Sequence, residues 1–158
     1  MAYIDKINVE GINYDLGALE SLKDTNGHNR FIEGNITTTA LTGVTYDYAK
    51  WSLSGTHLML VIAGKIEDGV TIADNFTFGT ADIPEWISNK IYPSYFGNYI
   101  EFKTIKARST TSWAGKDYDI RMGKVSGDLV ITKNNATEND TGVTLGFRMQ
   151  FDLLIDND

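Results

Sequence analysis

Residues 143–155 read VTLGFRMQFDLLI, with an apolar side chain at every second position from Val143 to Ile155. The positions in between are polar or small until Leu154 interrupts the alternation. Because the side chains of a β-strand point alternately to its two faces, the pattern predicts one long strand with an apolar face and a polar face. Such a strand needs neighbouring strands beside it and a second layer over its apolar face. We therefore expect the rest of the chain to supply a sheet and its cover.

The chain has 158 residues, no cysteine and a formal net charge of −7. This length is enough for one domain with a sizeable core. The negative charge argues against nucleic-acid binding, which needs a cationic face, and against binding to an anionic membrane surface. The lack of cysteine excludes disulfides and thiolate metal sites. The N-terminus has no apolar secretory signal, and the longest apolar run, residues 58–63, is too short to cross a bilayer, so we expect neither Sec export nor membrane insertion.

Segments with strand character, separated by turn residues, fill the chain from residue 31 onward. Residues 57–66 are apolar on both faces, which predicts a strand in the middle of a sheet that is covered on both sides. Residues 69–78 are predicted to form another strand, and Pro84 is predicted to start a single helical turn. About nine or ten strands with turns every 8–12 residues are typical of an antiparallel sandwich or barrel. The other predicted strands span residues 31–38, 43–53, 99–107, 118–122 and 128–132.

The first 27 residues are predicted to form a separate N-terminal segment, with residues 28–158 as the main domain. Ile7 and Val9 lie on one face of a short strand, and residues 12–16 can return antiparallel to it. A short helix is expected next, in which Leu16, Leu19 and Leu22 make a stripe too narrow to be stable alone. This segment must therefore pack on the main domain, on a neighbouring subunit or on a larger assembly.

The chain contains no strong catalytic motif. His28 and His57 are isolated in the sequence, and no nucleophile elbow, phosphate-binding loop or zinc-protease motif occurs. Asp117 and Asp119 can face the same way on a strand, as the two carboxylates of a glycosidase do, but a solvated sheet face explains them as well. Residues 134–140 fit a polar turn better than a calcium loop. We therefore predict no enzymatic activity, no cofactor and no metal site.

Aromatic side chains gather in two segments with loop character. Because loops lie on the surface, aromatic residues there often mark a subunit interface or a platform on which a sugar ring stacks, whereas buried aromatic residues belong to the core. The candidate receptor or interface residues are Trp86, Tyr92, Tyr95, Phe96, Trp113 and Tyr118.

The pattern Ile7-x-Val9-x-Gly11-x-x-Tyr14-Asp15-Leu16 resembles the start of many tail-fibre, baseplate and head-fibre proteins of bacteriophages. In those proteins a short hairpin and a small helix dock the chain on the virion. The resemblance implies docking through Ile7, Val9, Tyr14, Leu16, Leu19 and Leu22.

The main domain is similar to the compact heads of the same proteins, which end in a long alternating strand. Their Ile-Pro or Leu-Pro step before an aromatic-Pro turn has counterparts in Ile83-Pro84 and Tyr92-Pro93. The resemblance implies an all-β, jelly-roll-like antiparallel β-sandwich that assembles as a homotrimer. Residues 25–30 leave no room for a coiled-coil or collagen-like shaft, which favours a short fibre, head fibre or decoration protein over a long fibre.

These observations predict a bacteriophage or prophage structural protein located in the virion and made in the host cytoplasm. Its N-terminal segment is expected to bind other virion proteins, and its head to bind a host-surface receptor such as a glycan. The alternative is a carbohydrate-binding module that uses exposed Trp and Tyr side chains. A third hypothesis is a small glycosidase or lyase with Asp117 and Asp119 as its acid pair.

Overall fold

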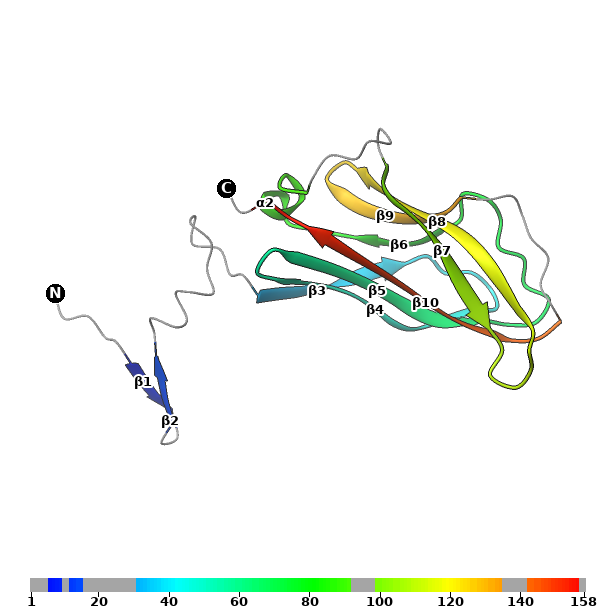
Figure 1. The fold of residues 1–158 in the computed structure, drawn as a ribbon, viewed down its shortest axis with the longest axis horizontal. Coiled ribbons are helices and arrows are strands. Elements are labelled where there is room, and N and C mark those ends of the chain that lie inside the picture. Colours follow the sequence, from blue (N-terminus) through cyan, green and yellow to red (C-terminus); the bar gives the residue numbers. More distant parts are fainter. Residues whose placement is uncertain (1–5, 10–11, 16–30, 92–98, 135–141, 157–158) are drawn as a thin grey trace.

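A computed structural model of the protein describes residues 6–9, 12–15, 31–91, 99–134 and 142–156 (Figure 1). In the described chain, eight antiparallel strands close into a barrel in the order β10-β5-β4-β3-β6-β9-β8-β7. One short helix, α2 (Glu85–Ser88), follows β6. The barrel strands are β3 (Phe31–Thr38), β4 (Val44–Ser54), β5 (His57–Ile66), β6 (Thr77–Ala81), β7 (Tyr99–Arg108), β8 (Gly115–Val125), β9 (Asp128–Lys133) and β10 (Leu145–Leu154).

The all-β class predicted from the sequence is confirmed, but the jelly-roll-like β-sandwich is wrong. The strands at the two ends of the order, β7 and β10, pair at Arg108 and Gly146, and this pair closes a single sheet on itself. Alternation along a strand identifies its buried face but not the layer that covers it. In this barrel, the far side of the same sheet provides that cover.

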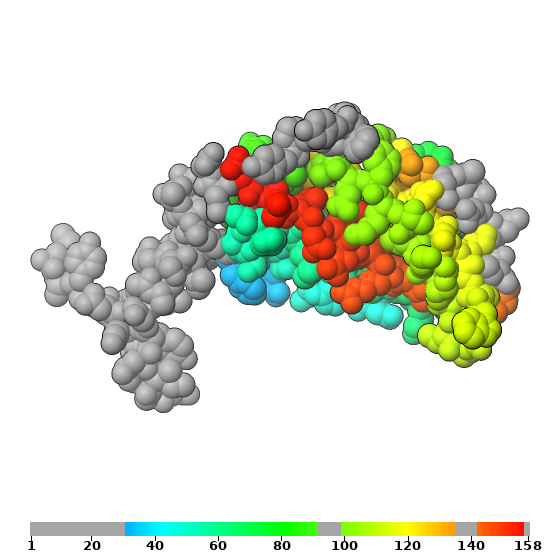
Figure 2. Space-filling view, viewed as in Figure 1, coloured from blue at the N-terminus to red at the C-terminus, as the bar shows by residue number. Residues whose placement is uncertain are grey.

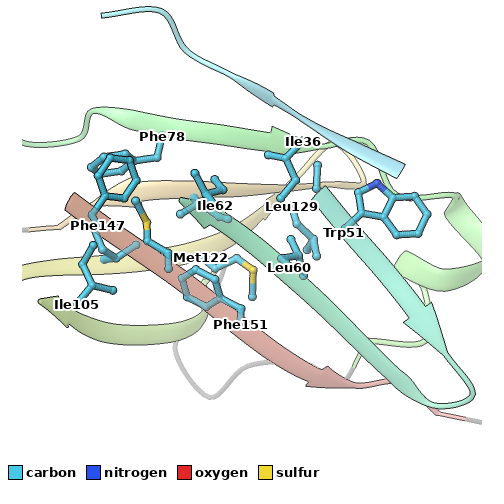
Figure 3. Close-up of a cluster of buried hydrophobic side chains, with 14 of the residues drawn as sticks. Ile36, Trp51, Leu60, Ile62, Phe78, Ile105, Met122, Leu129, Phe147 and Phe151 are labelled. Atoms are coloured by element: carbon cyan, nitrogen blue, oxygen red, sulfur yellow. The ribbon is translucent and has the colours of Figure 1, made fainter. Parts of the chain in front are cut away.

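The long C-terminal strand has the predicted alternation. Along β10 the buried side chains are Leu145, Phe147, Met149, Phe151 and Leu153, which belong to one core cluster with residues of the other strands. Figure 3 shows Phe147 and Phe151 in this cluster. Over its whole length β10 pairs antiparallel with β5, from Leu145 opposite Ile66 to Leu154 opposite His57.

The predicted central strand β5 lies between β4 and β10, as its apolar sequence indicates. Its inward residues Leu58, Leu60 and Ile62 are fully buried. The expectation that both faces are covered holds on the outer face for Val61, which is buried, but not for Met59 and Ala63, which are only half-buried. An apolar strand flank is therefore left at the surface of the barrel.

The predicted strand over residues 69–78 is shorter than expected. Only its end joins β6, whereas residues before it form turns around the fully buried Ile72. Asn75 has a φ of 60°, a left-handed conformation that Asn tolerates better than most residues and that interrupts an extended chain. The helical turn after Pro84 is confirmed as α2, which buries Ile87 completely.

Near the N-terminus, β1 (Lys6–Val9) and β2 (Ile12–Asp15) form the predicted antiparallel hairpin, with Ile7 opposite Tyr14 and Val9 opposite Ile12. This pair is a two-stranded sheet separate from the barrel sheet. The predicted helix with Leu16, Leu19 and Leu22 lies outside the described residues, and the boundary at residue 27 stays a prediction. None of the helices in the described ranges is long and apolar enough to span a bilayer.

Candidate functional site

The loop between β7 and β8, residues 109–114, carries the most exposed of the large apolar side chains in the described chain, Trp113, whose relative exposure is 102%. Hydrogen bonds inside the loop fix its shape. The Ser109 amide donates to the Ala114 carbonyl at 3.0 Å, and the Ser109 and Ser112 hydroxyls accept the amides of Thr111 and Ala114, each at 3.2 Å. The loop therefore holds the indole in water, although burying a side chain of this size is strongly favourable.

The base of this loop is also fixed, by the guanidinium of Arg108. It donates to the carbonyl oxygens of Ala107 and Lys116 at 2.9 and 3.0 Å, and to Oδ1 of Asp117 at 2.8 Å. An indole presented from such a base offers a flat apolar surface to a partner at little cost in ordering. Stacking on a sugar ring or insertion into a protein pocket are the two contacts that this geometry suits.

The structure does not bring the other predicted aromatic residues to this loop. Trp86 is half-buried on α2 and packs against the core. Helix α2 and the loop between β7 and β8 lie at opposite ends of the barrel (Figure 1). Tyr118 is 1% exposed inside the barrel, which removes it from any outer binding surface. Tyr92, Tyr95 and Phe96 lie outside the described residues.

The sequence pattern missed a cluster around Arg121 on the outside of β8. The guanidinium donates to Thr132 Oγ1 at 3.1 Å, to Asn134 Oδ1 at 3.0 Å and to Oδ1 of Asn75. It also lies 4.6 Å from the ring centre of Tyr99. Three of its five N–H donors are given to protein acceptors, so Arg121 joins β8 and β9 to the turn before β6.

The two acids of the glycosidase hypothesis do lie on the same outer face of β8, as their spacing predicts. Each is already engaged by a neighbour on β7. Asp117 pairs with Arg108, and Asp119 accepts a hydrogen bond from the Thr104 hydroxyl at 2.7 Å. These contacts connect β7 and β8 across an exposed surface. They favour the interpretation of Asp117 and Asp119 as polar residues of a solvated sheet face.

Beyond the closing pair, side chains link β7 to β10. Lys103 Nζ donates to the Gln150 carbonyl at 2.5 Å and lies 5.5 Å from the ring centre of Phe151. Glu101 Oε1 is 3.7 Å from the same ammonium. Partial burial raises the pKa of Glu101, Lys103 acts in the opposite direction, and the charge of Asp152 raises it further. Burial is the largest of these effects, so the fold favours the neutral acid more than water does.

Replacing Glu101 by glutamine is expected to stabilise the barrel increasingly as the pH rises above 4.5, the ordinary pKa of the group. The folded-state pKa of Glu101 is raised, so its contribution is complete at acidic pH and is lost as the pH increases through the raised value. Glutamine keeps the neutral shape at every pH. Urea unfolding of both proteins between acidic and neutral pH measures the difference, and Glu33→Gln at an exposed position is the control. A difference that shrinks toward neutral pH contradicts this assignment.

A polar hollow of about 480 Å³ lies beside α2. Its lining includes the acids Asp82, Glu85 and Asp128, and Lys124, whose ammonium donates to the Ser88 carbonyl at 2.6 Å. Lys124 thereby ties β8 to the helix. Within the described ranges, no group of three or more His, Asp or Glu side chains is placed to hold a metal ion.

No protein-family model and no curated protein matches the sequence. Among solved structures, a reovirus attachment protein, sigma1, in complex with alpha-2,3-sialyllactose is similar with a TM-score of 0.42 and 12% identity. The alignment covers 96% of this chain and 86% of that chain. A likeness at this TM-score does not establish a shared fold or function.

Proposed function

We propose that the protein is a structural component of a bacteriophage or prophage virion, a short fibre, head fibre or decoration protein with the barrel as its head. The observation that carries the proposal is the N-terminal hairpin of β1 and β2, which forms a sheet separate from the barrel. Of the residues that resemble the docking segments of phage fibre and baseplate proteins, Ile7, Val9, Tyr14 and Asp15 fall on this hairpin, with Ile7 directly opposite Tyr14.

A two-stranded hairpin is at best marginally stable in water by itself. With only four residues in each strand, β1 and β2 need a surface against which to pack. A neighbouring virion protein provides such a surface in the proposed assembly. The chain is then incorporated into a particle in the host cytoplasm and leaves the cell at lysis.

The head is proposed to bind a host-surface receptor through Trp113, and to assemble as the homotrimer that the sequence resemblance implies. A virion that carries several copies of the head can bind several receptors at once. Each receptor contact after the first forms at a high effective concentration, so contacts that are weak singly give strong overall binding. No catalytic step is part of the proposal.

Deleting residues 1–27 is expected to abolish incorporation into particles while leaving the barrel folded, since the barrel sheet is complete without β1 and β2. Antibodies against the barrel should detect the full chain, but not the truncated chain, in particles purified from the strain that encodes the protein. Circular dichroism and denaturant unfolding of the truncated chain report whether the barrel is intact. Absence of the full chain from purified particles contradicts the virion assignment.

The full exposure of Trp113 also favours a second candidate, a carbohydrate-binding module that acts outside a virion. Both candidates use the same indole, so glycan-induced quenching of its fluorescence supports receptor binding by either. Presence in particles and loss of that presence on deleting the hairpin separate the two.

A further inference from the structure

A shallow groove of about 280 Å³ runs along the outside of the barrel over β4, β5 and β10. Its floor is the outer flank of β5, Met59, Val61 and Ala63, with Tyr48 on one side and Arg148 on the other. We call these five residues, together with Lys50 and Ser52 of β4 and Gln150 and Asp152 of β10, the outer face. Figure 2 shows β10 running diagonally across the molecular surface with β5 beside it.

The outer face is more apolar than the surface of a soluble barrel requires. Tyr48 is 47% exposed, and Met59 and Ala63 are half-buried on either side of the buried Val61, in a strand whose other side already fills the core. The groove volume is below the roughly 300–1,000 Å³ of typical small-molecule sites, and its floor has no polar side chain to orient a ligand. A broad flat partner fits these properties better than a small molecule does.

The strand register arranges the outer face in rows. Ala63 lies between Tyr48 and Arg148, Val61 lies between Lys50 and Gln150, and Met59 lies between Ser52 and Asp152. The first and last rows are therefore opposite in size and charge. On β5 the small Ala63 is followed by the large Met59, on β4 the large Tyr48 by the small Ser52, and on β10 the cation Arg148 by the anion Asp152.

We propose that the outer face binds the same face of a second copy of this chain across a twofold axis that lies in the contact above Val61, along the row of Lys50, Val61 and Gln150. Such an axis reverses the order of the rows. It sets Ala63 against Met59 of the second copy, Tyr48 against Ser52, and Arg148 against Asp152. Each large side chain then meets a small one and each charge meets its opposite, which is the self-complementarity that an isologous contact needs.

The polar groups that face the axis are compatible with this contact. In the single chain, Arg148 donates to Gln150 Oε1 at 2.8 Å, and Gln150 Nε2 lies 3.3 and 3.2 Å from Oδ1 and Oδ2 of Asp152. Gln150 lies in the middle row and therefore stays between the two charges in the pair. Lys50 in that row is directed toward Glu33 Oε1 at 3.9 Å, which offsets its charge beside the second copy's Lys50. The contact goes beyond the threefold assembly proposed above, because a twofold axis joins copies or trimers in pairs.

Charge reversal at two positions tests the twofold axis directly. Mass measurements across a protein dilution series should give an even number of copies for the full chain. Arg148→Asp alone and Asp152→Arg alone should each raise the dissociation constant about tenfold or more, because each leaves two like charges facing each other twice per pair. The double variant restores opposite charges across the axis and should regain most of the affinity. Asp82→Arg, on an exposed site beside α2, is the matched control and should leave the mass unchanged.

Far-UV circular dichroism establishes that each variant is folded before its mass is interpreted. Equal dissociation constants for all four variants and the full chain overturn the inference. An assembly of three copies also overturns it while keeping the proposed trimeric head. A monomer at every concentration overturns both the twofold contact and the proposed homotrimer.

Discussion

Replacing Phe151 by alanine is expected to lower the free energy of unfolding by about 3–5 kcal/mol, the usual cost of emptying a buried aromatic site. Phe151 is fully buried on β10, opposite Leu60 of β5, and Lys103 lies over its ring. Pairing with β5 holds the backbone at this position, so we expect the barrel not to collapse easily around the missing ring. The variant loses both the transfer energy of the ring and the contacts of the atoms that line the cavity.

Leu154 on the same strand provides the matched control. It is 55% exposed, and Leu154→Ala is expected to change the free energy of unfolding by no more than about 0.5 kcal/mol. Urea unfolding of both variants at one protein concentration measures the difference. Similar losses at the two positions contradict the orientation of β10 in the barrel, because they place Phe151 and Leu154 in equivalent environments.

The alternation of β10 and the apolar sequence of β5 were sufficient to predict both strands and the buried side chains on the inner face of each. These features depend on neighbouring residues in the chain, since the period of two directly sets which side chains share a face. The N-terminal hairpin is predictable for the same reason, because Glu10-Gly11 stands between two short strand segments.

Barrel closure has no such local sign. It depends on pairing between Arg108 and Gly146, two residues on strands distant in the chain, and their sequence surroundings are as compatible with a sandwich edge. The candidate site was hard to predict for the same reason, because its residues come together from distant parts of the chain. Arg121, Asn75 and Tyr99 converge from three separate segments, and Tyr118 alternates into the core although it closely follows an exposed loop. The sequence predicted aromatic residues at the surface, but the place of each one in the fold decides whether it is accessible, as the loop position of Trp113 and the inward direction of Tyr118 on β8 show.

Replacing Gly64 by alanine is expected to lower the free energy of unfolding by about 1–3 kcal/mol through overpacking, and by more if the strands cannot separate. Tyr46 lies opposite Gly64 and Tyr48 opposite Ala63, so Asp47 is an extra residue that forms a bulge in β4. Beside this bulge the backbone of β4 lies close to Gly64. A Cβ atom there would overlap the carbonyl oxygen of Thr45, which is backbone and cannot rotate away. Relief therefore requires a shift of β4 against β5, in the sheet that carries the outer face.

Gly146→Ala on the neighbouring strand β10 separates this steric effect from the general effect of adding a methyl group. The nearest atom to its added Cβ is the Arg108 carbonyl oxygen at 3.7 Å, an ordinary contact distance. Since alanine also reduces the conformational freedom of the unfolded chain, this control is expected to leave stability unchanged or to raise it by about 0.4–1 kcal/mol. Thermal and urea unfolding of the two variants provide the comparison. If Gly64→Ala is as stable as Gly146→Ala, the backbone of β4 beside the bulge at Asp47 does not lie close to Gly64, and the row register of the outer face, which starts immediately after the bulge at Tyr48, loses its structural basis.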